Sequence, residues 1–380
     1  MKFILISPKN RTAYNFRGDL VREIIACGYE VVVTGPNRDH VDKIEALGAR
    51  FVEIPMDKNG VDPVSDLRYE RALYKLFCAE KPDAVLGYTS KPVIYGSLAA
   101  KRAGVPHVTA MLTGLGYAFT QRTAKARAIR LVMSALYKLA LGRADTVIFQ
   151  NPDDQKRFVK AGLVREEKSR VVSGSGVNTE KFAVAPLPQT PTFFMLSRVM
   201  YYKGIREYLA ACRKVKQKHP EVRCMLLGAC ENIQDSLSEA QLQPYIDDGT
   251  IEHFGETDDV AAYYRQCSVF VLPSYSEGTP RTVLEAMSMG RAILTTDAPG
   301  CRETVIDGQN GFLVPVRDAD ALAERMIELI EHPARIAQMG AASAQYCRER
   351  FDVRKVNRDM RAYIGIEGDP AGGQPRTHGA

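Results

Sequence analysis

The chain has 380 residues, of which 45% are hydrophobic, and it carries 51 basic and 45 acidic residues. This length and hydrophobic content suffice for two α/β domains with cores of their own. The eight cysteines include no C-x-x-C pair, which argues against a zinc site or a disulfide framework and favours reduced thiols in a cytosolic protein.

The positive charge is concentrated in the first half of the chain. Residues 1–180 contain 28 basic and 19 acidic residues, whereas residues 181–380 contain 23 and 26. No acidic residue occurs between Ala84 and Ala144, a segment that holds nine basic ones. We therefore expect the first half to face an anionic partner, a membrane surface rather than a nucleic acid.

The N-terminal half alternates short apolar runs with helical patterns. Its first apolar run is too short for a signal peptide and is expected to be a strand. Strands are predicted at Phe3–Ile6, Glu30–Thr34, Phe51–Ile54, Ala84–Leu86, His107–Ala110 and Thr146–Phe149. This alternation predicts βαβ units around a parallel sheet, hence a first Rossmann-like domain over residues 1–180.

A basic amphipathic helix is predicted over residues 122–142. Its expected apolar face is formed by Ile129, Val132, Met133, Leu136, Leu139 and Ala140, and another face carries Arg127, Arg130, Ser134 and Lys138. One interpretation is a helix that packs on the domain core with solvated basic residues outside. The other is a helix that docks on an anionic membrane, and both hold if the helix lies at the rim of the domain.

A linker is predicted between the halves, where a Gly- and Ser-rich run at 173–178 precedes the proline-dotted run Pro186 to Pro191. The second half repeats the alternation over residues 181–364, so a second α/β domain is expected there. Its strands are predicted at Thr192–Leu196, Val222–Leu227, Thr250–Phe254, Val269–Pro273, Ala292–Thr295 and Phe312–Val314. The tail 365–380 is expected to be disordered.

The stretch from Val269 to Val305 organises the second half. After the strand, a loop must lead to Pro280, which fits the first position of a helix, so Glu277 lies in the loop and Glu285 about one turn into the helix. The carboxyl end of such a strand is where open α/β sheets bind ligands, and the helix N-terminus suits a phosphate.

The string Glu277-Gly278-Thr279-Pro280, with a second glutamate at Glu285, resembles the E-x7-E signature of glycosyltransferase family 4. Three further pieces of that family's pattern occur along the chain in the family's order. They are Ser197-Arg198 with Lys203-Gly204, then Gly228, then Gly300-Cys301-Arg302-Glu303. The resemblance implies retaining enzymes of the GT-B fold, two Rossmann-like domains that face each other across a cleft. The first half lacks the family's Gly-Gly pair after the first strand, and Thr113 or Gly114 stands where other branches place a histidine.

The resemblance also assigns roles to residues of the second half. It implies that Arg198 and Lys203 contact the diphosphate of a nucleotide-sugar donor, that Glu285 binds the ribose, and that Glu277 and Glu303 lie near the donor sugar. The implied donor-binding set is completed by Gly278, Thr279, Arg281, the backbone N–H groups of Thr282 and Val283, and Asn178 in the turn that borders the nucleotide. Asp318-Ala319-Asp320 spells a D-x-D motif but opens a helix, so we interpret it as a cap and expect neither a metal nor a cofactor.

The segments at 14–17 and 114–116 resemble the branch that extends undecaprenyl-diphosphate-linked saccharides. The expected reaction is transfer from a UDP-sugar, an N-acetylhexosamine such as UDP-GalNAc, to a lipid-linked saccharide in bacterial surface polysaccharide or glycan synthesis. The expected location is peripheral, on the cytoplasmic face of the inner membrane. The alternatives are a GT-B UDP-sugar 2-epimerase, which is not expected to carry the E-x7-E string, and a non-catalytic nucleotide-sugar-binding subunit.

Overall fold

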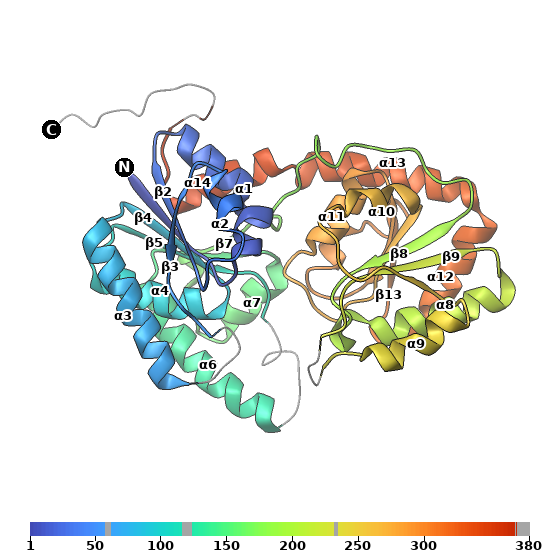
Figure 1. Cartoon of the computed structure of the whole chain (residues 1–380), viewed down its shortest axis with the longest axis horizontal. Coiled ribbons are helices and arrows are strands. Elements are labelled where there is room, and N and C mark those ends of the chain that lie inside the picture. Colours follow the sequence, from blue (N-terminus) through green and yellow to red (C-terminus); the bar gives the residue numbers. More distant parts are fainter. Residues whose placement is uncertain (58–61, 116–123, 232–234, 369, 371–380) are drawn as a thin grey trace. The chain divides into compact units, whose positions relative to one another are not determined.

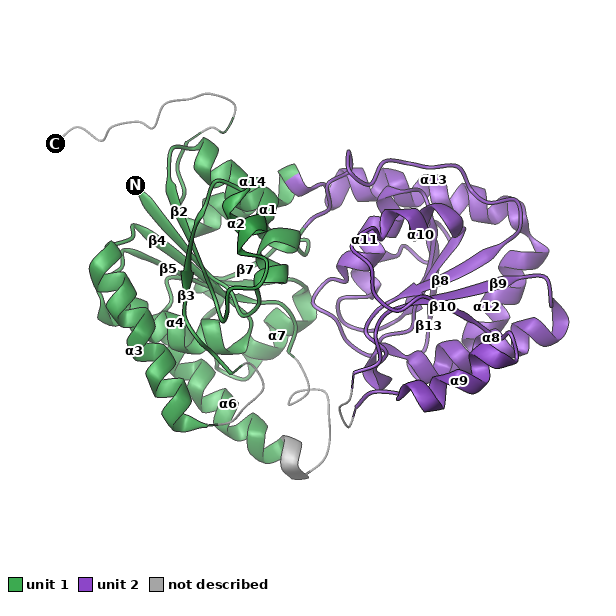
Figure 2. Ribbon diagram, in the orientation of Figure 1, with its two compact units in different colours: residues 1–175, 354–380 green, residues 176–353 purple. Residues whose placement is uncertain are grey.

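The computed structural model of the protein describes residues 1–57, 62–115, 124–231, 235–368 and 370 (Figure 1). The chain forms two units, Met1–Ser175 with Arg354–Ala380, and Gly176–Val353 (Figure 2). It crosses from the first unit to the second after Ser175 and returns after Val353. The boundaries expected from the sequence were 180/181 and 364/365, and residue 369 and residues 371–380 of the expected tail lie outside the described ranges.

The first unit is built on a parallel sheet in the order β3-β2-β1-β4-β5-β6-β7. Its strands are β1 (Lys2–Ile6), β2 (Glu30–Gly35), β3 (Arg50–Glu53), β4 (Ala84–Tyr88), β5 (His107–Leu112), β6 (Thr146–Phe149) and β7 (Ser169–Val171). The helices are α1 (Asn10–Ala26), α2 (Val41–Glu45), α3 (Pro63–Glu80), α4 (Ser90–Arg102), α6 (Ala124–Arg143), α7 (Pro152–Lys160), the 3₁₀ turn η1 (Glu166–Lys168) and α14 (Val353–Ile364). All six predicted strands are present, and β7 is an additional edge strand.

Both faces of this sheet are buried. Along β1, Phe3 and Leu5 belong to one apolar cluster and Ile4 and Ile6 to another, because successive side chains of a strand point to opposite faces. This arrangement explains why the parallel strands consist of continuous apolar runs. The helix α14 contributes Met360 to the same cluster as Phe3.

The second unit has the sheet order β10-β9-β8-β11-β12-β13, and its named strand pairs are parallel. Its strands are β8 (Thr192–Leu196), β9 (Arg223–Leu227), β10 (Glu252–His253), β11 (Val269–Leu272), β12 (Ala292–Thr296) and β13 (Gly311–Val314). The helices are α8 (Ile205–Lys218), α9 (Glu239–Asp247), α10 (Ala261–Gln266), α11 (Arg281–Ser288), α12 (Ala319–Glu331) and α13 (Pro333–Arg350), with 3₁₀ turns η2 (Tyr201–Lys203) and η3 (Arg302–Thr304). The predicted cap of α12 is confirmed, since the Asp318 carboxylate accepts a hydrogen bond from Ala321 N at 2.9 Å.

The predicted basic helix is α6, and its apolar face differs from the prediction. Tyr137, Ala140 and Leu141 are buried in the core of the first unit, but Val132 and Leu139 are exposed. The prediction combined residues that lie on two different sides of the helix. Within the described residues, no helix has both the length and the hydropathy needed to cross a bilayer.

In each sheet there is one pair of neighbouring strands whose following connections run to opposite faces of the sheet. In the second unit this switch point lies between β8 and β11, and in the first unit between β1 and β4. Ligands of open α/β sheets bind outside the carboxyl ends of the strands at such a switch point. The loops after β8 and β11 carry Arg198, Lys203 and Glu277, three of the residues that the sequence predicted as functional.

Candidate functional site

Lys203 and Glu277 meet at the switch point of the second unit. Lys203 ends the turn η2 after β8, Glu277 lies in the loop after β11, and their side chains form an ion pair. Only 17% of the lysine and 13% of the glutamate side chain is exposed. Burial lowers the pKa of the Lys203 ammonium group, but the Glu277 carboxylate outweighs that effect, so the pKa is raised above its ordinary value. Lys203 therefore carries a fixed positive charge at neutral pH.

Two glycines allow these loops to approach each other. Gly204 has φ +77°, and a Cβ there would lie 2.1 Å from the carbonyl oxygen of Pro273. Gly300 has φ +82°, and its Cβ would lie 2.3 Å from the carbonyl oxygen of Glu277. Such distances are shorter than any van der Waals contact, so only glycine fits both positions. Gly204, next to Lys203, and Gly300, which opens the Gly300–Glu303 motif, thus allow the close approach that positions Lys203 and Glu277.

Arg198 is held beside Lys203 by a residue that the sequence analysis did not select. Its Nη2 lies 2.5 Å from the hydroxyl oxygen of Tyr202, and its Nη1 lies 3.4 Å from a carboxylate oxygen of Glu231. The Tyr202 carbonyl accepts a hydrogen bond from Tyr275 N at 2.9 Å. The ammonium group of Lys203 lies 5.2 Å from the centre of the Tyr202 ring. Tyr202 therefore links both cations to the loop after β11.

Glu285 forms a second polar cluster on α11. Its Oε1 accepts from Arg281 Nε at 3.2 Å, and its Oε2 lies 3.1 Å from the hydroxyl oxygen of Tyr264. Burial raises the pKa of the Glu285 carboxyl group, and the Arg281 charge only partly offsets that rise. The Tyr264 hydroxyl also lies 2.8 Å from Thr282 O, so this fully buried tyrosine joins the first turn of α11 to the carboxylate.

The N-terminus of α11 differs in two details from the prediction. Pro280 is the residue before the helix rather than its first helical residue, because its ψ of 109° is extended. The N–H of Val283 is not free, since it donates to Pro280 O at 3.0 Å and closes a tight first turn. Gly278 and Thr279 are buried in the preceding loop. Thr282 is the second residue of α11, directly before Val283.

Asn178 and Glu303 occupy turns next to these clusters. The side-chain oxygen of Asn178 accepts from the backbone N–H groups of Glu180 and Lys181, at 3.1 and 2.9 Å, and so closes its own turn. The Lys181 charge in that turn partly offsets the rise that burial causes in the pKa of the Glu285 carboxyl group. Glu303 lies in η3, where its carbonyl accepts from the Tyr346 hydroxyl at 3.2 Å. The predicted residues therefore fall into neighbouring loops of one unit.

The first unit has a polar cluster at its own switch point, which the sequence analysis did not identify. The hydroxyl oxygen of Tyr88, at the end of β4, lies 2.5 Å from the Ser7 hydroxyl after β1 and 2.9 Å from the Thr12 hydroxyl on α1. The Arg17 guanidinium, which is 3% exposed, lies 5.5 Å from the centre of the Tyr88 ring. These three hydroxyl residues follow β1, lie on α1 and end β4, so no spacing in the sequence signals them and only the topology brings them together.

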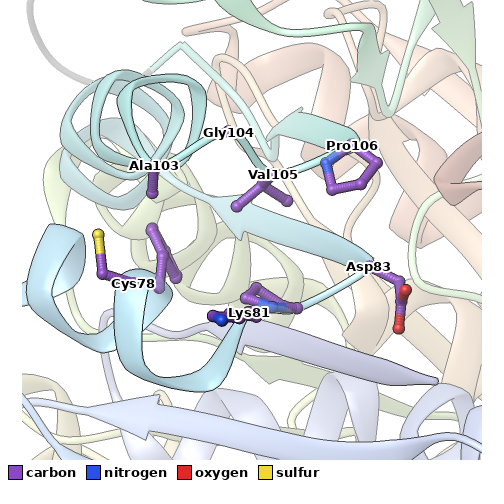
Figure 3. Close-up of a pocket in the computed structure, with 9 residues that line it drawn as sticks. Cys78, Lys81, Asp83, Ala103, Gly104, Val105 and Pro106 are labelled. Carbon is purple, nitrogen blue, oxygen red and sulfur yellow. The ribbon is translucent and has the colours of Figure 1, made fainter.

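A cavity of about 420 Å³ lies at the opposite edge of the first sheet (Figure 3). It is lined by the last turn of α3, which carries Cys78, and by the connections that follow α3 and α4, where Lys81 and Asp83 precede β4. None of the residues predicted to bind the donor lines it. It is therefore separate from the switch point.

Chemically, the second unit presents two cations and a carboxylate, Arg198, Lys203 and Glu277, at its switch point. A second carboxylate, Glu285, lies on α11. Charged donors fixed in advance are suited to stabilising a departing diphosphate. A buried carboxylate with several lone pairs is suited to accepting hydrogen bonds from vicinal hydroxyl groups. The arrangement fits a nucleoside diphosphate that carries a sugar.

Comparison with known proteins agrees with this chemistry. Residues 190–332 match the family described as glycosyl transferases group 1, and residues 4–151 match glycosyl transferase 4-like proteins. The chain is 27% identical over 345 residues to a Campylobacter jejuni protein, N,N'-diacetylbacillosaminyl-diphospho-undecaprenol alpha-1,3-N-acetylgalactosaminyltransferase, covering 87% of this chain and 90% of that protein. It is 26% identical to an Escherichia coli protein, UDP-Gal:alpha-D-GlcNAc-diphosphoundecaprenol alpha-1,3-galactosyltransferase, covering 78% of each chain.

Solved structures give the same fold. Sucrose-phosphate synthase from Thermosynechococcus elongatus superposes with a TM-score of 0.79 at 19% identity, covering 95% of this chain and 98% of that one. Anabaena HepE, solved in complex with UDP and glucose, superposes with a TM-score of 0.78 at 17% identity, covering 96% and 99%. The chain is thus a family 4, group 1 glycosyltransferase with the GT-B fold.

Proposed function

We propose that this enzyme is a retaining glycosyltransferase that moves an N-acetylhexosamine from a UDP-sugar, such as UDP-GalNAc, to an undecaprenyl-diphosphate-linked saccharide. The product would enter bacterial surface polysaccharide or glycan synthesis. Two relatives that match most of the chain carry names with a diphosphoundecaprenol-linked substrate. The observation that carries the proposal is the Lys203–Glu277 pair at the switch point, with Arg198 beside it.

The donor's charge determines the roles of the cations. Arg198 and Lys203 bind the diphosphate and stabilise the charge that it gains on leaving. Glu285 accepts hydrogen bonds from the ribose hydroxyls, with Arg281 and Tyr264 holding its carboxylate. Glu277 and Glu303 orient the donor sugar, and the Lys203 charge fixes the Glu277 side chain. Gly278, Thr279 and Thr282 line the donor's path along the start of α11, and the Asn178 turn borders the nucleotide.

The transfer breaks the bond between the anomeric carbon and the diphosphate oxygen. An acceptor hydroxyl forms the new bond on the same face of the sugar, and its proton passes to the departing phosphate oxygen. Configuration is thus retained without a second carboxylate placed as a nucleophile, in contrast to retaining glycosidases. Cations fixed before the reaction suit this scheme, because the leaving group both accepts the proton and carries away negative charge.

The proposed acceptor places the enzyme at the cytoplasmic face of the inner membrane as a peripheral protein. An undecaprenyl chain holds the acceptor in the bilayer, whereas a UDP-sugar is dissolved in the cytoplasm. The basic first half of the chain fits the negative potential of anionic lipids.

The test is to incubate the purified enzyme with each of UDP-GalNAc, UDP-GlcNAc, UDP-galactose and UDP-glucose, with and without an undecaprenyl-diphosphate-linked saccharide. Mass spectrometry then identifies the transferred sugar, and NMR identifies its anomeric configuration. We expect an added N-acetylhexosamine with an α linkage. A β linkage would exclude retention, inversion at C2 without acceptor would indicate an epimerase, and binding without turnover would indicate a non-catalytic subunit.

A further inference from the structure

Helix α6 has apolar residues on two opposite sides. Tyr137 and Ala140 face the core, where the Tyr137 ring lies 5.4 Å from that of Phe158 and its hydroxyl lies 3.0 Å from Ser90 Oγ. On the other side, Leu131 is 75% exposed and Leu139 is 51% exposed. The helix is therefore docked on its unit by one side and leaves a second apolar side exposed. Its ribbon lies at the periphery of the unit (Figure 2).

The outward residues form one stripe. Leu131, Val132 and Leu139 are joined by two exposed alanines, and the spacing i, i+3, i+4, i+7, i+11 places all five on one side of a helix. We call this set the apolar stripe: Ala128, Leu131, Val132, Ala135 and Leu139. It extends for about 16 Å along the helix axis. These leucines and this valine account for three of the most exposed large apolar side chains in the described part of the chain.

Exposed basic residues border the stripe. Arg127 and Lys138, which are eleven residues apart, lie along one side of it, and Arg143 lies in the last turn. No acidic residue occurs in the sequence from Ala84 to Ala144, so the helix itself contributes no opposing charge. An apolar stripe with cationic borders is complementary to the acyl boundary and the phosphate groups of anionic lipids.

We propose that the apolar stripe inserts into the surface of an anionic bilayer, with α6 parallel to the membrane plane and its basic borders at the lipid phosphates. The inference rests on the proposed function, because a lipid-linked acceptor requires the enzyme to work at a membrane. A second copy of the chain is a poorer occupant, since a self-contact of the stripe brings borders of the same charge together.

The test measures vesicle binding. Vesicles of phosphatidylcholine with about 30% phosphatidylglycerol are mixed with the full-length enzyme and floated through a density gradient. We expect Leu131→Ser with Leu139→Ser to weaken binding by tenfold or more, on the order of the effect of removing two inserted leucines. We expect Arg127→Gln with Lys138→Gln to weaken it by about fivefold per charge, and only when phosphatidylglycerol is present.

Matched controls use similar exposed residues elsewhere on the same unit. Val64 and Leu67 on α3 are 57% and 47% exposed, so Val64→Ser with Leu67→Ser removes a comparable apolar area. Lys75→Gln with Lys156→Gln removes two exposed charges. Both control variants should bind vesicles like the wild type. Equal loss in the control and stripe variants would overturn the proposal, as would stripe variants that bind normally.

A second measurement separates this inference from the proposed function. Transfer is assayed without vesicles on a short-chain prenyl-diphosphate-linked saccharide that is soluble in water. Stripe variants should retain wild-type turnover there and lose it only on undecaprenyl acceptor in vesicles. A wild-type enzyme with no transfer in either assay would refute the proposed function while leaving the vesicle result to stand. Sedimentation that shows a dimer broken by the stripe variants, with unchanged vesicle binding, would assign the stripe to a second copy.

Discussion

Lys203 and Arg198 differ in how they are held, although both are proposed to bind the diphosphate. Lys203 is largely buried and paired with Glu277, whereas 47% of the Arg198 side chain is exposed, and it is held by Tyr202 and Glu231. A diphosphate bound as proposed would compete with Glu231 for Arg198, because both are anions. Tyr202 is neutral and can keep the guanidinium in place while a phosphate replaces the carboxylate.

Lys203→Ala or Arg198→Ala should lower kcat by on the order of a hundredfold, because each removes a charge aimed at the leaving group. Initial rates at saturating donor measure the effect. Arg213→Ala is the control, since Arg213 is a half-buried arginine on α8 that pairs with Asp248 at 2.7 Å. Near-normal kcat in pure, folded Lys203→Ala protein would remove Lys203 from the proposed role.

Glu285 makes folding depend on pH. Burial raises its pKa in the folded protein above that of the unfolded chain, so the folded state binds the proton more tightly. Wild-type stability relative to Glu285→Gln should therefore fall as pH rises from the unfolded pKa through the folded one, and stay constant above it. Thermal unfolding of both proteins across this pH range tests the sign. A wild type that becomes more stable relative to Glu285→Gln as the pH rises would contradict it.

The same substitution should also raise the KM for the UDP-sugar at neutral pH by about tenfold or more, since it replaces a charged hydrogen-bond acceptor. Glu331→Gln, at an exposed position on α12, is the control for the KM measurement. It should leave the KM unchanged. A Glu285→Gln enzyme with wild-type KM would separate the buried carboxylate from donor binding.

At the scale of elements, the strands were largely predictable because a parallel sheet buries both faces and requires continuous apolar runs. β7 was not predicted, since Ser169–Val171 is a three-residue edge strand with two polar residues. The apolar pattern of α6 was assigned to one face, because the sequence does not reveal that a second apolar side is exposed in the described part of the chain. Tyr202 and Tyr264 were missed because tyrosines in apolar surroundings have the same pattern as core residues.

The glycine-dependent loop contacts allow a prediction at this scale. Gly300→Ala should destabilise the second unit by about 2 kcal/mol or more, because it adds a backbone clash to a left-handed conformation. Gly249→Ala is the matched control, since Gly249 has φ +71° but nothing within 4 Å of its would-be Cβ. It should cost only about 1 kcal/mol. Chemical denaturation measures both, and equal costs would mean that the approach of Gly300 to Glu277 is not tight.

At the scale of the whole molecule, the chain completes its first unit with its last helix. Residues from Arg354 onward belong to the first unit, where Val356, Met360 and Ile364 are buried in its core. Asn357 Nδ2 donates to a carboxylate oxygen of Glu23 on α1 at 2.8 Å. The second unit, which holds all of the proposed donor-binding residues, is a continuous segment inserted between the two parts of the first.

Each unit therefore has a core of its own, and a core substitution should act on one unit alone. Met360→Ala should destabilise the first unit by about 2–5 kcal/mol, the cost of truncating a fully buried methionine. Met326→Ala on α12, equally buried in the second unit, is the matched variant. Scanning calorimetry with and without UDP measures the two transitions, because a ligand stabilises only the unit that binds it. We expect Met360→Ala to lower the transition that UDP leaves unchanged and Met326→Ala to lower the one that UDP raises. A single transition lowered equally by both variants would instead mean that the two units unfold as one cooperative body.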